Sequence, residues 1–188
     1  MKKAFFFDKD GIFNADRDIP SETGDELYPF CGDVIACLRD AGFGIFIVTN
    51  QPAVARGVIT ERDLKGMFEK FRRALLGQNE GALIDHIYYC PHHPDATLQE
   101  YRINCECRKP KPGMLKKAAA EYDIDLKDSF MVGDRISDII AGYLGGCRTV
   151  LCMTGKHLEK IIKTDLKVPE VKADFCIKDI SELKNIGL

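Results

Sequence analysis

Two aspartates one residue apart, Asp8 and Asp10, follow an apolar run of three phenylalanines near the start of the sequence. A second acidic pair, Asp134 and Asp138, follows another apolar run far along the chain. Carboxylates that gather in one place raise each other's pKa unless a cation joins them. Mg²⁺ is usually held by one or two carboxylates together with a substrate phosphate. The four aspartates together therefore predict a magnesium site, although any one of them alone is typical of a turn or a helix cap.

The aspartate that directly follows the apolar run, Asp8, is the candidate nucleophile. A carboxylate can attack phosphorus and form an aspartyl-phosphate, and a buried strand would hold this side chain rigidly. Asp10 lies two residues further on and points to the same side of an extended backbone. It therefore suits general acid–base catalysis, in which it protonates the leaving alcohol and later deprotonates water.

Two other stretches offer groups that bind a phosphoryl group. Thr49 and Asn50 end an apolar run, where a hydroxyl and backbone N–H groups hold phosphoryl oxygens; an ordinary turn is the alternative. Arg108, Lys109 and Lys111 concentrate positive charge in the stretch RKPKPG, and phosphoryl transfer requires such charge. A solvated basic loop is the alternative here, but its place just before a helix favours function.

A cysteine–histidine cluster lies in the long loop of residues 90–107. One residue separates the members of each of two pairs, Cys90 with His92 and Cys105 with Cys107. Three thiolates and an imidazole match a tetrahedral structural zinc site, with His93 as the rival ligand. The metal would fold a loop that has no core of its own. The remaining cysteines lie among apolar residues and are predicted to be buried: Cys31, Cys37, Cys147, Cys152 and Cys176.

The bulk properties predict one globular domain over residues 1–188. The chain is 45% apolar and 30% charged, and its net charge of −2 provides no basic field for nucleic acid or an anionic membrane. No apolar run approaches the roughly 20 residues that span a bilayer. The first apolar run ends at Asp8, too early for a signal peptide. We therefore expect a cytoplasmic protein, and nothing in the sequence demands more than a monomer.

Short apolar runs that read as strands alternate with segments of helical periodicity throughout the chain. This alternation predicts an α/β fold with a doubly wound, mostly parallel sheet. The polar candidates follow three of these runs, and ligands of open α/β sheets bind at the carboxyl ends of strands. The three groups are therefore expected to meet in one crevice. The predicted strands are residues 4–7, 44–48, 84–89, 130–132, 149–152 and 175–177.

The motifs, taken in order, resemble those of phosphatases of the haloacid dehalogenase superfamily. The matching stretches are DKDG, VTN, the lysine of RKPKPG, and GDRISD. VTNQPAVARG, YYCPHHP and CECRKPKPGML are more closely similar to its histidinol-phosphatase-like branch, whose members carry a zinc loop. The resemblance spans nearly the whole chain. It implies a Rossmann-like core with a zinc-stabilised loop and no large cap domain. Ile12 departs from the family, which usually has Thr there.

The resemblance also implies a role for individual residues. Asp8 is the nucleophile, Asp10 the general acid/base, and Thr49 and Lys109 stabilise the phosphoryl group. The implied Mg²⁺ ligands are Asp8, the Asp10 carbonyl and Asp134, with Asp138 nearby through water. The implied Zn²⁺ ligands are Cys90, His92, Cys105 and Cys107. The implied substrate contacts are Asp16, Arg17, Asp18, Ile19, Asn50, Gln51, Pro52, Arg108 and Arg135.

The activity that the resemblance implies is hydrolysis of the C7 phosphate of a heptose 1,7-bisphosphate, in the supply of nucleotide-activated heptose for lipopolysaccharide or S-layers. Histidinol phosphate, or another small sugar phosphate, is the alternative substrate. Arg108 and Arg135 suit a second phosphate better than the cationic amine of histidinol phosphate. A receiver-like module would have no use for an acid/base at Asp10. A zinc-nucleated nucleic-acid binder is disfavoured by the near-neutral charge.

Overall fold

The structure is a computed structural model that describes residues 2–15, 26–156, 158 and 171–186. The predicted substrate loop from Asp16 to Ile19 lies outside the described residues. In the described part of the chain, loops with one or two helices connect the strands, and no separate cap domain is present among these residues. No helix among these residues is long and apolar enough to cross a membrane.

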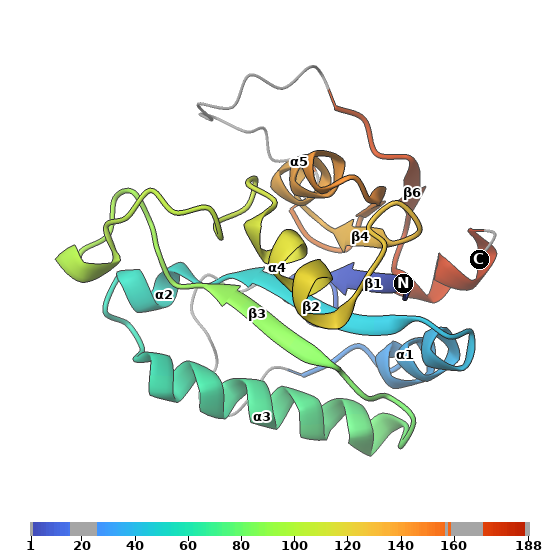
Figure 1. Ribbon diagram of the computed structural model, residues 1–188. Helices are drawn as coiled ribbons and strands as arrows, with labels where there is room; N and C mark the ends of the chain where they lie inside the picture. The colour runs from blue at the N-terminus through green and yellow to red at the C-terminus, as the bar shows by residue number, and fades with distance from the viewer. Residues whose placement is uncertain (1, 16–25, 157, 159–170, 187–188) are drawn as a thin grey trace.

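A six-stranded sheet forms the centre of the molecule, with the strand order β3-β2-β1-β4-β5-β6 (Figure 1). Each neighbouring pair of strands is parallel, which confirms the predicted doubly wound sheet. Strand β2 extends two residues beyond the prediction, so Thr49 and Asn50 belong to the strand and not to a turn. The strands are β1 (Ala4–Phe7), β2 (Gly44–Asn50), β3 (His86–Cys90), β4 (Phe130–Gly133), β5 (Arg148–Cys152) and β6 (Phe175–Ile177).

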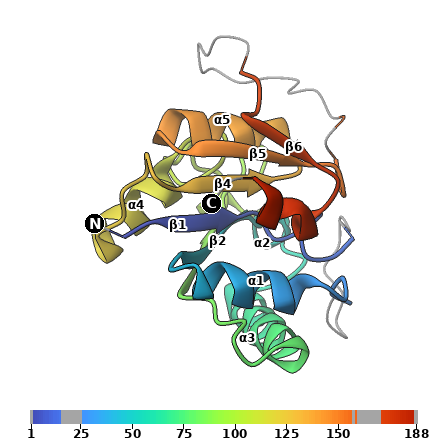
Figure 2. The ribbon, with the colours of Figure 1, turned by 90° about the vertical axis from the view of Figure 1, so that its right-hand side faces the viewer.

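Helices cover both faces of the sheet (Figure 2). One face carries α1 (Cys31–Asp40) and α3 (Glu61–Gln78), and the other carries α4 (Gly113–Tyr122) and α5 (Ile136–Gly145). Successive side chains of a strand point to opposite faces. Phe5 and Phe7 accordingly pack in the core under α1 and α3, whereas Phe6 packs under α4. The phenylalanine run is therefore buried on both faces, as a central parallel strand requires.

Helix α3 begins at a capping box. The Thr60 hydroxyl accepts a hydrogen bond from the Asp63 N–H at 3.1 Å, and the Asp63 carboxylate accepts one from the Thr60 N–H at 3.0 Å. These two bonds satisfy backbone donors that the first turn leaves free. The sequence does not reveal two short elements, α2 (Pro52–Ala55) and the 3₁₀ turn η1 (Gln99–Tyr101). The short C-terminal helix that it predicts is the 3₁₀ turn η2 (Ile180–Asn185), capped by Asp179 and not by Ser181.

The structure shows the surroundings of Ile12, which departs from the family, and corrects the prediction for two cysteines. Ile12 is fully buried in the core between the sheet and α1, so the residue that replaces the usual Thr is a packing residue here. Cys37 and Cys176 are exposed, so the prediction that they are buried is wrong. Cys37 lies on the exposed face of α1, and Cys176 is the middle residue of β6, the edge strand of the sheet.

Candidate active site

The carboxyl ends of β1 and β4 bring the two acidic segments together. Strand β1 lies between β2 and β4, and the Asp8 N–H continues its pairing by donating to the Val132 carbonyl at 2.9 Å. Oxygen atoms of Asp8, Asp134 and Asp138 all lie within 4.8 Å of one another. The three side chains are almost completely buried. The convergence that the motif order predicts is therefore present in the fold.

A buried lysine lies among these carboxylates. The Lys109 ammonium is 3.0 Å from Asp8 Oδ1 and 2.6 Å from Asp138 Oδ1. The rival Lys111 pairs instead with Glu106 at 2.8 Å and with the Asn104 side chain at 3.0 Å, both outside the pocket. Burial favours the neutral lysine, but the two carboxylates outweigh it and raise the pKa of Lys109. The pocket therefore contains a fixed positive charge.

The carboxylates carry more negative charge than Lys109 balances. Burial, with the nearby Asp138 and Asp134 carboxylates, raises the pKa of Asp8 from 3.8 to about 7, although the Lys109 charge opposes the shift. Burial and the Asp138 carboxylate likewise raise the pKa of Asp134 to about 6. Such shifts mark carboxylates that lack a counter-charge. A divalent cation at this position would supply one.

The oxygen atoms of the pocket fit a magnesium ion. Asp134 Oδ1 is buried and has no hydrogen-bond donor among the described residues, which leaves it available as a ligand. Asp134 Oδ2 accepts from the Lys156 N–H at 2.6 Å. Asp138 is engaged differently, because one oxygen faces Lys109 and the other accepts from the Arg135 N–H at 3.0 Å. This arrangement agrees with direct ligation by Asp134 and an indirect role for Asp138.

The backbone at two glycines packs closely against the Asp134 carboxylate. A Cβ atom on Gly155 would lie 2.1 Å from Asp134 Oδ2, and one on Gly11 would lie 2.5 Å from the same oxygen. Gly11 also has a φ of +85°, a conformation that side chains other than glycine rarely adopt. The glycine of the first motif therefore lets the chain leave β1 while it remains close to the acidic cluster.

Asp10 is held by a separate set of donors. Its Oδ1 accepts from the Lys9 ammonium at 2.6 Å and from the Asn14 amide at 3.5 Å, and its Oδ2 accepts from the Gln51 amide at 3.0 Å. Burial would raise the pKa of Asp10, but the Lys9 charge and these hydrogen bonds outweigh it and lower the pKa. Asp8 and Asp10 are therefore in opposite electrostatic environments, although only one residue separates them.

Asn50 fixes the lysine-bearing segment to the end of β2. Its side-chain amide donates to the Lys109 carbonyl and accepts from the Lys109 N–H, each at 3.0 Å. Thr49 is fully buried beside it. The peptide bond between Lys109 and Pro110 is cis. The VTN motif and the RKPKPG stretch, which are distant in sequence, therefore form one rigid wall of the pocket.

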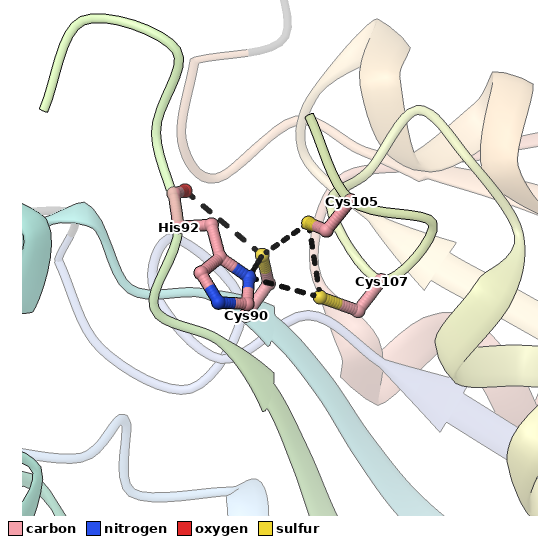
Figure 3. Close-up of side chains that lie close together, drawn as sticks. All are labelled: Cys90, His92, Cys105 and Cys107. Atoms are coloured by element: carbon pink, nitrogen blue, oxygen red, sulfur yellow. Dashed lines mark hydrogen bonds between the residues drawn. The ribbon is translucent and has the colours of Figure 1, made fainter. Parts of the chain in front are cut away.

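The predicted cysteine–histidine cluster also assembles (Figure 3). The sulfur of Cys105 lies 3.4 Å from that of Cys90 and 3.1 Å from that of Cys107. His92 Nδ1 lies 3.8 Å and 3.5 Å from the Cys90 and Cys107 sulfurs. A tetrahedral ion with Zn–S bonds of about 2.3 Å would set its ligand atoms roughly 3.5–3.8 Å apart. The four residues fit such an ion without large movement.

The rival His93 points elsewhere, since its Nδ1 accepts from the Asp95 N–H at 3.0 Å. The hydrogen bond from the Cys90 thiol lowers the pKa of Cys107 to about 5, against the effect of burial. A thiolate is the form that binds a metal. The cluster also contacts the RKPKPG stretch, because the Arg108 guanidinium donates to the His92 carbonyl at 3.0 Å.

Two other predicted substrate residues, Pro52 and Arg135, directly follow Gln51 and Asp134 in the chain. Pro52 is the first residue of α2 and is half-buried, and Arg135 precedes the first turn of α5. The amides of Asn50 and Gln51 are both engaged by protein groups. Sequence reasoning missed Lys9 and Asn14, which contact Asp10. The lysine between two aspartates in DKDG was the available signal, since it lies beside opposite charges.

The fold and the site define a phosphohydrolase of the haloacid dehalogenase (HAD) superfamily, and residues 106–183 match a family model described as HAD-hydrolase-like. Proteins named D-glycero-beta-D-manno-heptose-1,7-bisphosphate 7-phosphatase align over most of the chain. The one from Yersinia pestis is 42% identical and covers 96% of this chain and 92% of its own length. The one from Escherichia coli K12 is 36% identical, and the match covers 96% of this chain and 91% of the E. coli protein.

Solved structures agree with these relatives. The D,D-heptose 1,7-bisphosphate phosphatase from B. bronchiseptica, complexed with magnesium and phosphate, has a TM-score of 0.80 and 32% identity. The match covers 97% of this chain and 96% of the B. bronchiseptica chain. The enzyme of the same name from Burkholderia thailandensis has a TM-score of 0.68, 26% identity and full coverage of both chains. The chain therefore belongs to the heptose-1,7-bisphosphate 7-phosphatase family, and it is a phosphatase.

Proposed function

We propose that the protein hydrolyses the C7 phosphate of D-glycero-beta-D-manno-heptose 1,7-bisphosphate. The observation that carries this proposal is the convergence of Asp8, Lys109 and Asp134 in one buried pocket. The relatives named for this reaction support the substrate and the beta anomer. The product would feed the synthesis of nucleotide-activated heptose.

In the first step, an Asp8 oxygen attacks phosphorus and the bond from phosphorus to the C7 oxygen breaks. Asp10 gives a proton to the departing sugar oxygen. The Lys109 ammonium and the Thr49 hydroxyl stabilise the charge on the transferring group. The incoming phosphate also places negative charge close to Asp10, which favours its protonated form. The aspartyl-phosphate on Asp8 and the free C7 hydroxyl are the products of this step.

In the second step, Asp10 takes a proton from water as the water oxygen attacks phosphorus. The bond from phosphorus to Asp8 breaks, which frees inorganic phosphate and restores the carboxylate. Mg²⁺ held by Asp8, the Asp10 carbonyl and Asp134 would neutralise the carboxylates and the phosphate when bound. Among the described residues, no donor forms a hydrogen bond with the buried Asp134 Oδ1, which supports Asp134 as a ligand.

We assign a structural Zn²⁺ to Cys90, His92, Cys105 and Cys107. All four positions of a tetrahedral ion would be filled, so the metal has no open position for catalysis. Its proposed function is to hold Arg108 at the pocket through the His92 carbonyl. Thiolate ligands need a reducing compartment, which supports a cytoplasmic location. We propose that a monomer suffices, since the described residues form the catalytic pocket within one chain.

Arg108 and Arg135 are the proposed contacts for the second phosphate, with Asn50, Gln51, Pro52 and the loop from Asp16 to Ile19 lining the remainder of the substrate site. Two arginines favour a bisphosphate over the cationic amine of histidinol phosphate. Burial lowers the pKa of Arg108, and the nearby Arg56 and Arg135 contribute to the shift. A positive field of this kind favours an additional anionic group.

The decisive experiment compares kcat/KM, with Mg²⁺ present, for both anomers of heptose 1,7-bisphosphate, for histidinol phosphate and for fructose 1,6-bisphosphate. The beta heptose bisphosphate should be hydrolysed best. Arg108→Met should reduce the preference for a bisphosphate over a monophosphate by roughly 10-fold or more, the scale of a lost charged hydrogen bond. The exposed Arg62→Met is the matched control. A preference for histidinol phosphate would overturn the substrate assignment.

A further inference from the structure

The side chain of Gln51 is enclosed by catalytic groups. It is only 5% exposed. Its amide nitrogen donates to Asp10 Oδ2 at 3.0 Å and to Thr49 Oγ1 at 3.1 Å. An ionised carboxylate can only accept hydrogen bonds, so the nitrogen of the amide must face Asp10. Both hydrogens of this nitrogen are therefore directed at residues with proposed catalytic roles.

The two oxygens of Asp10 have different partners. Lys9 and Asn14 contact Oδ1, whereas Gln51 contacts Oδ2. A carboxylate held only at one oxygen can turn about that contact. A group that transfers a proton must lie within about 2.6–3.2 Å of its target in the reacting complex. Among the described residues, the Gln51 amide is therefore the contact that sets the rotation of the Asp10 carboxylate.

The same amide determines how the Thr49 hydroxyl is used. A hydroxyl has one proton to donate and two lone pairs that accept. Because one lone pair of Thr49 accepts from Gln51, the hydroxyl proton remains available for a different acceptor. A phosphoryl oxygen in the pocket is such an acceptor. The backbone N–H of Gln51 donates to the Cys90 carbonyl at 2.8 Å, which fixes the position from which the amide acts.

We propose that Gln51 is a positioning residue of the phosphatase reaction. Its amide holds the Asp10 carboxylate in line with the leaving sugar oxygen and directs the Thr49 hydroxyl proton toward the phosphoryl group. This inference rests on the proposed function, because it takes Asp10 as the general acid/base. It differs from a direct substrate contact, since the amide donors of Gln51 are both engaged by protein groups.

The test uses two leaving groups of different basicity. A sugar alkoxide needs a proton as it departs, whereas p-nitrophenolate departs without one. The value of kcat/KM reports the steps up to departure of the leaving group. Gln51→Met keeps the size of the side chain and removes both donors. It should lower kcat/KM for heptose bisphosphate about 10-fold more than for p-nitrophenyl phosphate, a part of the roughly 10²–10⁴-fold that general acid catalysis contributes as a whole.

Two reference variants accompany this measurement. Asp10→Asn should show the same selective loss on the sugar phosphate, and a larger one. Gln78→Met removes a half-buried glutamine that donates to the Tyr28 carbonyl at 3.0 Å and accepts from the Gly32 N–H at 2.7 Å, away from the pocket. It should leave both values of kcat/KM within about twofold, the scale of a change under 0.5 kcal/mol.

Equal losses of Gln51→Met on the two substrates, or no loss on either, would overturn the inference. If Gln51→Met does not fold, as judged by its thermal transition, Gln51→Leu replaces it. That variant has a similar volume and also lacks both donors. The proposed substrate fails independently if the wild-type protein cleaves p-nitrophenyl phosphate but not heptose bisphosphate. The comparison is then made with the best alkyl phosphate that the protein does cleave.

Discussion

The protein has two clusters suited to metal ions, and the chain builds them in opposite ways. The acidic cluster of Asp8, Asp134 and Asp138 lies at the ends of β1 and β4 and is almost completely buried. Three members of the cysteine–histidine cluster lie in a long loop and are only half-buried, whereas Cys90 ends β3 and is buried. Strand ends hold the first cluster in place, whereas the second joins one strand end to a loop.

This difference predicts what each metal ion contributes to its cluster. The acidic cluster is already assembled by strand pairing, so a cation there mainly balances charge and takes part in chemistry. Three ligands of the cysteine–histidine cluster lie outside helices and strands, so bonds to the ion must supply part of its stability. Removal of each metal should therefore have a different effect on the activity and the stability of the protein.

The largest effect should come from Asp8→Asn, which removes the proposed nucleophile and keeps the size of the side chain. Activity should fall about 10⁴-fold or more, as expected when one member of a catalytic unit is lost. Thermal stability should not fall, because burial and the neighbouring carboxylates already disfavour the Asp8 charge, and Asp138 still pairs with Lys109. Phosphate release and a melting curve measure both effects, and the exposed Asp95→Asn is the control. Retained activity would contradict the assignment of Asp8.

The next effect should come from Cys105→Ser, which removes one ligand of the cysteine–histidine cluster. The protein should lose most of its zinc, and kcat/KM should fall roughly 10–100-fold as Arg108 loses its support. Hydrogen exchange should accelerate over residues 90–107 and stay slow in the sheet. Metal analysis and exchange measurements check this, with the exposed Cys176→Ser as control. A zinc-free wild-type protein with full activity would refute the structural role.

A smaller effect should appear when magnesium is added at different pH values. The folded protein raises the pKa of Asp8 to about 7 and that of Asp134 to about 6, above the ordinary 3.8 of an unfolded chain. The associated stability is fully present below pH 3.8 and is lost as pH rises through 6–7. The metal-free protein should therefore gain more from Mg²⁺ at pH 8 than at pH 5.

The difference should be at least ~3 °C in melting temperature, the shift that about 1 kcal/mol produces in a chain of this size. Melting curves with EDTA and with Mg²⁺ at the two pH values provide the measurement. Asp134→Asn is the informative variant, because it removes one of the two titrating groups and should shrink the difference. An equal gain at both pH values would show that no cation sits on these carboxylates.

The smallest effect should come from Tyr101→Phe, at the contact between the loop of residues 90–107 and helix α3. The Glu61 carboxylate on α3 accepts from Tyr101 of the loop at 3.0 Å and from Tyr89 of the sheet at 2.5 Å. Losing one such bond should cost about 1 kcal/mol, and exchange should accelerate in the loop alone. The exposed Tyr143→Phe is the control. Equal acceleration in the sheet and the loop would contradict the separation between them.

Sequence reasoning succeeded where a side chain is tied to a strand end. Strand order in a parallel sheet brings DKDG and GDRISD together, so Asp8 and Asp134 could be placed from the motifs alone. The cysteine–histidine set could also be identified, since its residue types and spacing point to one kind of ion. The lysine was harder, because Lys109 and Lys111 flank the same proline and the sequence favours neither without the family resemblance.

The internal hydrogen bonds could not be predicted in the same way. Whether Gln51 faces the substrate or Asp10 depends on a side-chain rotation that no residue pattern encodes. The same is true of Asn50, whose amide pairs with the backbone of Lys109 across a gap of 59 residues in the sequence. The short helix α2 also escaped detection, because four residues are too few to show a helical period.

The pairing of β1 with β4 has a consequence for how the protein is made. Phe5 lies opposite Phe130, so the strand that carries Asp8 gains its second neighbour only after most of the chain has left the ribosome. Until then, one edge of an apolar phenylalanine strand is unpaired, and such edges promote aggregation. Contacts between distant segments also form slowly. Chaperone demand during synthesis should therefore depend on the interval between translation of β1 and translation of β4.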